Sequence, residues 1–153
     1  MRKPAAAATA LLLTALPLIG CGGDAVDKNA YVKAVSAVQA KTSGDAQKLS
    51  TEMQTAKTPK DIAEKLTELG TAVQSDADDL ARIKAPEEVT QDHQQYVQLM
   101  RDFGSNLKDL APQVEKATPT TVSNVLKKAT GYTTTLSTKE AKLISDINAQ
   151  LQK

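Results

Sequence analysis

The segment PKDIAEKLTELGTAVQSDADDLARIK, residues 59–84, decides the fold. Its apolar residues recur at steps of three and four, which places them on one face of an α-helix. They are Ile62, Leu66, Leu69, Val73, Ala77, Leu80 and Ile83. Thr58 and Pro59 form a helix-start signal, with Thr58 as N-cap and Pro59 in the first turn. A helix with one apolar face needs a partner, so the segment predicts a domain of packed helices.

The same periodicity predicts a helix over residues 27–56, with Asp27 as its N-cap. The apolar stripe keeps its register across Ser43-Gly44, which favours one continuous helix. A helical glycine costs about 1 kcal/mol relative to alanine. Because Ser43-Gly44-Asp45 also suits a turn, a break there is the alternative.

Two further helices are predicted over residues 86–116 and 119–151, each starting at an X-Pro signal. Pro112 lies inside the first of them and lacks a backbone N–H, so we expect the helix to kink or end there. In the second, Gly131 and the run Thr133-Thr134-Thr135 have poor helix propensity. We therefore expect a kink or a frayed segment near Gly131.

Four helical segments joined by short connections predict an all-α fold, an antiparallel up-and-down four-helix bundle over residues 27–153. The Pro-led helix starts recur roughly every 30 residues, so stacked helical hairpins are the alternative. The sequence has no strand-like alternation of any length.

The first 20 residues have the composition of a secretory signal. Arg2 and Lys3 precede an uncharged apolar run, residues 5–16, and Pro17 follows it. A membrane span needs roughly 20 apolar residues, so this run is too short to be one. We therefore predict an exported protein.

The leader ends in Leu18-Ile19-Gly20-Cys21, which resembles the lipobox of bacterial lipoproteins. The resemblance implies that Cys21 is the lipid-attachment residue and carries diacylglycerol, with palmitate as an expected fatty acid. It also implies cleavage between Gly20 and Cys21. Residues 1–20 would then be the signal peptide, 21–26 the lipidated cysteine and a short tether, and 27–153 the bundle. The protein would be extracytoplasmic and lipid-anchored to the bacterial cell membrane.

A second, shorter resemblance lies at the start of the third helix. The residues Ile83-Lys84-Ala85-Pro86-Glu87-Glu88-Val89 and His93-Gln94-Gln95-Tyr96-Val97 resemble a pattern in small envelope lipoproteins of unassigned function. This resemblance supports the bundle and implies no activity.

The net charge and the aromatic content of the chain limit the classes of partner that we expect. The formal net charge is +1, and it becomes −1 once the leader with its two basic residues is removed. A near-neutral chain gives no electrostatic reason to expect nucleic-acid binding. Aromatic residues make up 3% of the chain, which leaves few large side chains to wall a ligand cavity.

His93 is the only histidine, and it lies on the apolar stripe between Val89 and Tyr96. It is a weak candidate site residue, as a metal ligand or a proton-transfer group with Asp92 or Glu88 nearby. Zinc and copper sites normally use several His or Cys ligands, so we expect no metal site and no cofactor. The other interpretation is a histidine that is bonded to a facing helix or lies at the edge of the bundle.

The acidic residues Asp76, Asp78 and Asp79 are interpreted as a solvated helix face, because calcium loops place their ligands on a turn. Paired-carboxylate catalysis requires two acids that converge in a cleft. No such pair is indicated by the sequence.

These observations favour a non-enzymatic lipoprotein whose bundle binds another envelope protein. Two other classes stay open. One is a bundle that binds an apolar or amphipathic small molecule. The other is an enzyme that uses carboxylates or His93. The sequence does not distinguish an inner from an outer membrane.

Overall fold

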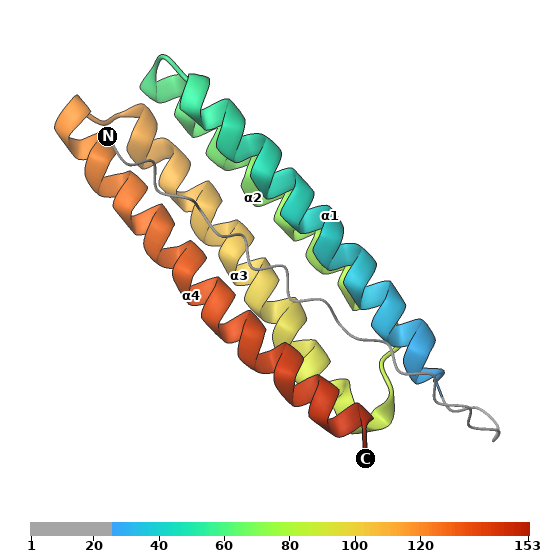
Figure 1. The fold of residues 1–153 in the computed structure, drawn as a ribbon. Helices are drawn as coiled ribbons and strands as arrows, with labels where there is room; N and C mark the ends of the chain where they lie inside the picture. Colours follow the sequence, from blue (N-terminus) through green and yellow to red (C-terminus); the bar gives the residue numbers. More distant parts are fainter. Residues whose placement is uncertain (1–25) are drawn as a thin grey trace, which may run out of the picture.

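The computed structural model describes residues 26–153, which form four long helices (Figure 1). The helices are α1 (Lys28–Thr55), α2 (Pro59–Ala81), α3 (Thr90–Glu115) and α4 (Pro119–Leu151), and a short 3-10 helix, η1 (Glu87–Val89), precedes α3. Consecutive helices run in opposite directions, and the described residues contain no strand. The predicted antiparallel four-helix bundle is confirmed.

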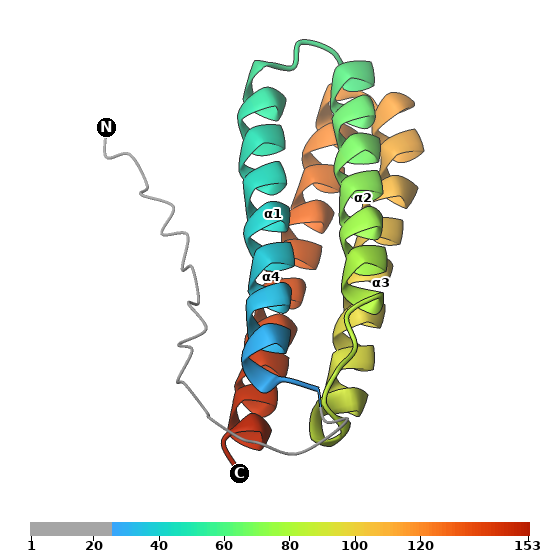
Figure 2. The same ribbon diagram turned by 90° about the vertical axis from the view of Figure 1, so that its right-hand side faces the viewer.

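The order of the helices around the bundle follows the chain. Figure 2 shows α1 and α4 on one side and α2 and α3 on the other. The start of α1 and the end of α4 lie at the same end of the rod (Figure 1), where Lys28 Nζ donates to the Leu151 carbonyl at 3.1 Å. The connections between α1 and α2 and between α3 and α4 lie at the far end.

The predicted caps explain where α1 and α2 begin. The Asp27 carboxylate accepts from the backbone N–H of Asn29 at 2.8 Å, so it satisfies a donor that the first turn leaves unpaired. At α2, Thr58 Oγ1 accepts from the Asp61 N–H, and the Asp61 carboxylate accepts from the Thr58 N–H. This reciprocal pair is a capping box, and it fixes the turn after α1.

The helix boundaries depart from prediction between α2 and α3. The α2 helix ends at Ala81, and α3 begins at Thr90 instead of residue 86. Pro86 is extended, and its carbonyl accepts from the Val89 N–H at 3.1 Å and from Thr90 Oγ1 at 3.0 Å. The first turn therefore closes as a 3-10 helix before the α-helix starts.

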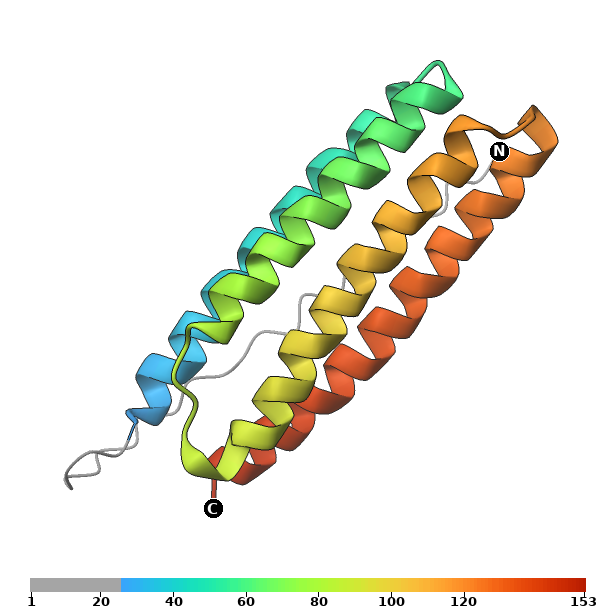
Figure 3. The same ribbon diagram turned by 180° about the vertical axis from the view of Figure 1, so that it is seen from behind.

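Three expected weak points do not interrupt their helices. The α1 helix is continuous through Gly44, and α3 passes Pro112 and ends at Glu115. Ala111 and Val114, on either side of Pro112, are both buried, and this packing holds the last turn in place. No frayed segment occurs at Gly131, and Figure 3 shows α4 as one continuous helix.

The threonine run in α4 is helical, and its hydroxyls bond to the helix's own backbone. The hydroxyl of each threonine donates to the carbonyl four residues earlier at 2.9–3.1 Å, at Thr130, Thr133, Thr134, Thr135 and Thr138. These bonds satisfy the hydroxyls without a competing turn. The low helix propensity of threonine does not take this local bonding into account.

The densest part of the core lies between α2 and α3. The ten largest side chains with almost no exposure all come from α2, η1 and α3. Gly70 and Gly104 face each other there. A Cβ added to Gly70 would lie 2.6 Å from the Gly104 carbonyl oxygen, and one added to Gly104 would lie 2.7 Å from that of Gly70. The glycines permit a close backbone approach that no other residue allows.

Candidate functional site

The predicted lipid-attachment residue, Cys21, and the predicted cleavage site at Gly20 lie outside the described residues, as do the leader and most of the tether. The description starts at Val26, which packs against the core one residue before the Asp27 cap. The start of α1 lies at the end of the rod that α1 and α4 share (Figure 1).

The other predicted site residue, His93, is buried in the bundle with 5% of its surface exposed. Its Nδ1 lies 3.1 Å from the Tyr31 hydroxyl of α1, and the two rings meet edge to face with centroids 5.6 Å apart. The structure thus matches the interpretation of a histidine bonded to a facing helix.

Burial is the main cause of the pKa shifts of both His93 and Tyr31. It lowers the pKa of His93, and the Leu80 carbonyl of α2 offsets part of that effect. The second ring nitrogen, Nε2, is buried without a well-formed hydrogen bond to any described residue. Burial also raises the pKa of Tyr31 to about 12, with a smaller contribution from the Asp92 charge. Both groups are therefore neutral near pH 7.

The carboxylates of Glu88 and Asp92, which lie near His93 in the sequence, bind residues other than His93. The Glu88 carboxylate pairs with Lys28 at 2.6 Å, which lowers the pKa of Glu88. The Asp92 carboxylate accepts from the Gln150 amide at 2.6 Å. Both contacts join α3 and η1 to the start of α1 and the end of α4, and neither places an acid on the His93 ring.

A second polar contact joins three helices, α1, α3 and α4. The Tyr96 hydroxyl of α3 donates to the Glu140 carboxylate of α4 at 2.6 Å, and the Gln39 amide of α1 donates to the same oxygen at 3.3 Å. Tyr96 has 1% of its surface exposed. Burial, then the Glu140 charge, raises the pKa of Tyr96 well above its ordinary value. Glu140, which breaks the apolar stripe of α4, is thus a bonded member of the interior.

A third polar contact holds α1 to α2 through Asp76, which is completely buried. Its carboxylate accepts from Thr42 Oγ1 at 2.7 Å and pairs with the Lys41 ammonium. The interpretation of Asp76 as part of a solvated face is therefore wrong. The missed signal is its spacing, because Leu69, Val73, Asp76 and Leu80 follow each other at steps of four, three and four.

The other two acids of the cluster do lie at the surface. Asp78 pairs with Arg101 of α3 at 2.8 Å, and Asp79 pairs with Arg82 at 3.1 Å. Lys41 pairs with Asp79 at 3.4 Å as well as with Asp76, so these two carboxylates share one cation, whereas Asp78 has a separate partner in Arg101. Among the described residues, no group of three or more His, Cys, Asp and Glu side chains has the arrangement of a metal site.

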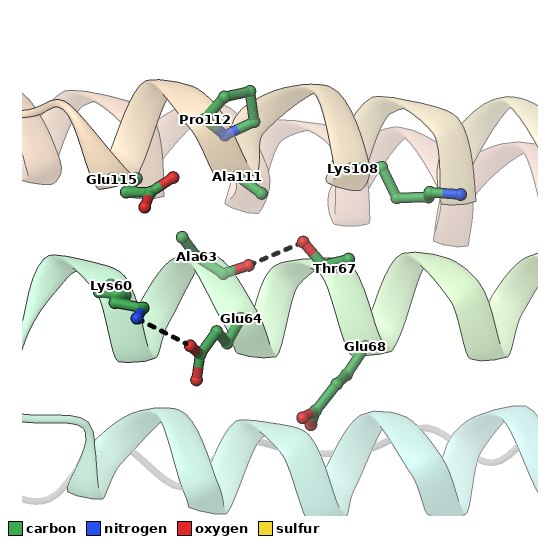
Figure 4. Close-up of a pocket in the computed structure, with 9 residues that line it drawn as sticks. All are labelled: Lys60, Ala63, Glu64, Thr67, Glu68, Lys108, Ala111, Pro112 and Glu115. Atoms are coloured by element: carbon green, nitrogen blue, oxygen red, sulfur yellow. Dashed lines mark hydrogen bonds and ion pairs between the residues drawn. The ribbon is translucent and has the colours of Figure 1, made fainter.

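Two grooves lie along the α2–α3 side. The one in Figure 4 is lined by small and charged side chains from both helices. Lys60 pairs with Glu64 at 3.9 Å, and Thr67 bonds to the Ala63 carbonyl, so part of its polar surface is already paired. The other groove lies beside the α2–α3 connection and includes Ile83, Ala85 and His93. Open grooves of this kind suit protein contact better than enclosure of a small molecule.

Comparison of the chain with protein-family models, with curated proteins and with solved structures finds no significant match. None of the helices formed by residues 26–153 is long and apolar enough to cross a membrane.

Proposed function

We propose that the protein is an extracytoplasmic lipoprotein, held at the bacterial cell membrane by lipid on Cys21. Its bundle is a non-enzymatic module that binds an envelope protein. The observation that carries this proposal is Leu18-Ile19-Gly20-Cys21, placed directly after an apolar leader with a basic start. Stable anchoring requires two lipid chains, which a diacylglycerol-modified cysteine supplies.

The tether sets where the bundle acts. Six residues lie between Cys21 and Lys28, the first residue of α1, and the seven steps from one to the other reach at most about 25 Å. The end of the rod that holds the start of α1 and the end of α4 would therefore lie close to the bilayer. The sides of the rod and its far end, formed by the α1–α2 and α3–α4 connections, would face outward for contact.

The anchor is tested by replacing the cysteine in the full chain. Cys21→Ala should move the protein from the membrane fraction to the soluble fraction and abolish labelling by a clickable fatty acid. Gly23→Ala is the matched control, because it alters the tether without removing the thiol. Unchanged membrane retention and labelling of Cys21→Ala would contradict the anchoring proposal.

The interaction role has its own test. Intact cells that produce the wild-type protein should give covalent adducts with envelope proteins after amine-reactive crosslinking. Cys21→Ala should lose those adducts at equal expression, because it removes the bundle from the membrane. Absence of any protein adduct from the wild-type chain would count against an interaction module.

A further inference from the structure

One of the two grooves on the α2–α3 side is lined by charge of a single sign. It has a volume of about 480 Å³ and lies beside the α2–α3 connection, and we name it the connection groove. Lys84 and Arg101 line it, and no acidic side chain does. The groove of Figure 4 differs, because two lysines and three glutamates line it. Of the two, the connection groove is therefore the one with a positive lining.

The two cations of the connection groove differ in their availability. Arg101 is paired with Asp78 at 2.8 Å. Lys84 is exposed and makes no ion pair with another described residue. Its neighbours in the chain, Ile83 and Ala85, are half-buried and also line the groove. The groove thus combines an unpaired ammonium with an apolar wall.

His93 also lines the connection groove, and one of its ring nitrogens lacks a partner. Among the described residues, Nε2 is the one buried side-chain nitrogen or oxygen without a hydrogen bond. The nearby Leu80 carbonyl already accepts from the Ile83 N–H at 3.0 Å. Buried polar groups are nearly always hydrogen-bonded, so an unpaired one indicates a partner that is absent.

The absent partner of Nε2 should be a hydrogen-bond acceptor. A neutral imidazole has one nitrogen that donates and one that accepts. When the Tyr31 hydroxyl donates to Nδ1, which lies 3.1 Å away, its proton is satisfied and Nε2 carries the ring proton. A carboxylate oxygen is a strong acceptor for such an N–H and an ion-pair partner for an ammonium. One carboxylate in the groove therefore suits both His93 and Lys84.

We infer that the connection groove binds a peptide segment of the envelope partner in which an acidic side chain stands beside an apolar one. The carboxylate pairs with Lys84 and accepts from His93 Nε2, and the apolar side chain packs against Ile83 and Ala85. This inference rests on the proposed function, because it assigns the chemistry of the partner that the bundle binds. The α2–α3 connection lies at the end of the rod where α1 begins and α4 ends (Figure 3). With the proposed anchor, the peptide would belong to a protein that is itself at the membrane.

The shape of the groove favours a peptide over an enclosed small molecule, because the groove is open along the surface. Nε2 is covered in this structure, so one wall has to move before a carboxylate reaches it. Residues 83–85 form part of that wall and lie between α2 and η1. They can shift without loss of hydrogen bonds within a helix.

The only histidine of the chain supplies the readout. Full-length protein with isotope-labelled histidine, in nanodiscs of zwitterionic lipid, is titrated with the capped peptide Ala-Leu-Glu-Leu-Ala and followed by NMR. We expect a saturable change of the Nε2 resonance, with a Kd of about 1 mM for so short a peptide. The pKa of His93 should rise by about 1, because a carboxylate beside the ring favours its charged form. The matched peptide with Gln in place of Glu should bind at least about tenfold more weakly.

Substitutions in the two grooves supply the comparison. Lys84→Gln should weaken binding of the Glu peptide about threefold and leave that of the Gln peptide unchanged. Lys60→Gln makes the same change in the groove of Figure 4 and should have no effect. His93→Gln should weaken binding of the Glu peptide about tenfold, measured through a labelled Ile83 methyl group. Circular dichroism of each variant confirms that the helices persist.

Several results would overturn the inference. A His93 resonance that does not respond to the Glu peptide would do so, as would equal binding of the Glu and Gln peptides. A response to nanodiscs that contain anionic lipid, in place of a response to the peptide, would assign the groove to a lipid headgroup. The titration is repeated with full-length Cys21→Ala without lipid, so that its result does not depend on the anchor. If the peptide fails there while the wild type still gives envelope crosslinks, the inference is wrong and the proposed function stands.

Discussion

The α2–α3 interface and the attachment of α1 are held together by different means. Between α2 and α3, two glycines bring the backbones into contact, and most of the large buried side chains surround them. The α1 helix contributes only three buried apolar residues, Tyr31, Val35 and Leu49. Val32, Val38 and Met53 of α1 are partly buried against the core. Polar contacts with His93, Glu140 and Asp76 add to these.

This difference shows which contacts stabilise a bundle with few aromatic residues and which fix the position of a helix in it. Close packing between α2 and α3 gives most of the stability, because dispersion and apolar burial are largest where backbones approach. The polar contacts of α1 contribute less energy and more selectivity, since a shift of α1 by one turn would leave a buried carboxylate unpaired. We therefore expect α1 to be the first helix to open and the pair α2–α3 to be the last.

The largest expected effect comes from filling the glycine contact. In Gly70→Ala, the new methyl would lie 2.6 Å from the Gly104 carbonyl oxygen, which belongs to backbone and cannot turn aside. The two helices would have to separate, and we expect a loss of about 2–3 kcal/mol in the free energy of unfolding. Urea unfolding followed by circular dichroism measures it. If Gly70→Ala lost less free energy of unfolding than a substitution at an exposed helical position, the two backbones would not be in tight contact.

The next effect comes from the buried carboxylate that holds α1. Asp76→Asn keeps the size of the side chain and removes the charge that pairs with Lys41. Hydrogen bonds to charged groups contribute about 1.5–3 kcal/mol, so we expect a loss of about 2 kcal/mol. Asp78→Asn makes the same chemical change two residues away in an exposed pair, and it should cost less than about 1 kcal/mol. If both variants lost the same free energy of unfolding, the buried Asp76 carboxylate would contribute no more to stability than the exposed Asp78 pair.

Much of the fold could be predicted from local patterns, because apolar periodicity and X-Pro starts are properties of single helices. The stripe of residues 59–84 predicts its own buried face, and Asp27 and Thr58 act as the caps that their positions indicate. Thr133–Thr135 show the limit of propensity, since that run is helical despite its low propensity and its hydroxyls bond back to the helix.

The features that join helices were not predictable in the same way. Nothing in the sequence pairs Gly70 with Gly104, because that contact depends on the rotation of α3 against α2. Asp76 and Ala77 both fit the spacing of the stripe, and only the neighbouring Thr42 and Lys41 show why the carboxylate points inward.

We expect a smaller effect of pH on the free energy of unfolding, because His93 contacts Tyr31 of α1. Burial lowers the pKa of His93 below its ordinary 6.5, so the folded state binds a proton less readily than the unfolded state. Stability should be highest above about pH 6.5 and fall as the pH drops through the folded pKa. His93→Gln does not titrate and should remove this slope between pH 7 and 5, measured by urea unfolding. The groups facing the ring are the Tyr31 hydroxyl and the Leu80 carbonyl, with the Asp92 charge close to Tyr31.

The smallest expected effect is a gain at the glycines that touch nothing. A Cβ added to Gly44 in α1 or to Gly131 in α4 meets no atom within 4 Å. Alanine is more favourable than glycine in a helix by up to about 1 kcal/mol, so Gly44→Ala and Gly131→Ala should each stabilise the bundle by up to that amount. Hydrogen exchange separates the two regions, since Gly44→Ala should slow exchange in α1 and leave the slowest amides of α2 and α3 as they are. A gain of protection confined to α2 and α3 would instead mean that α1 does not open on its own.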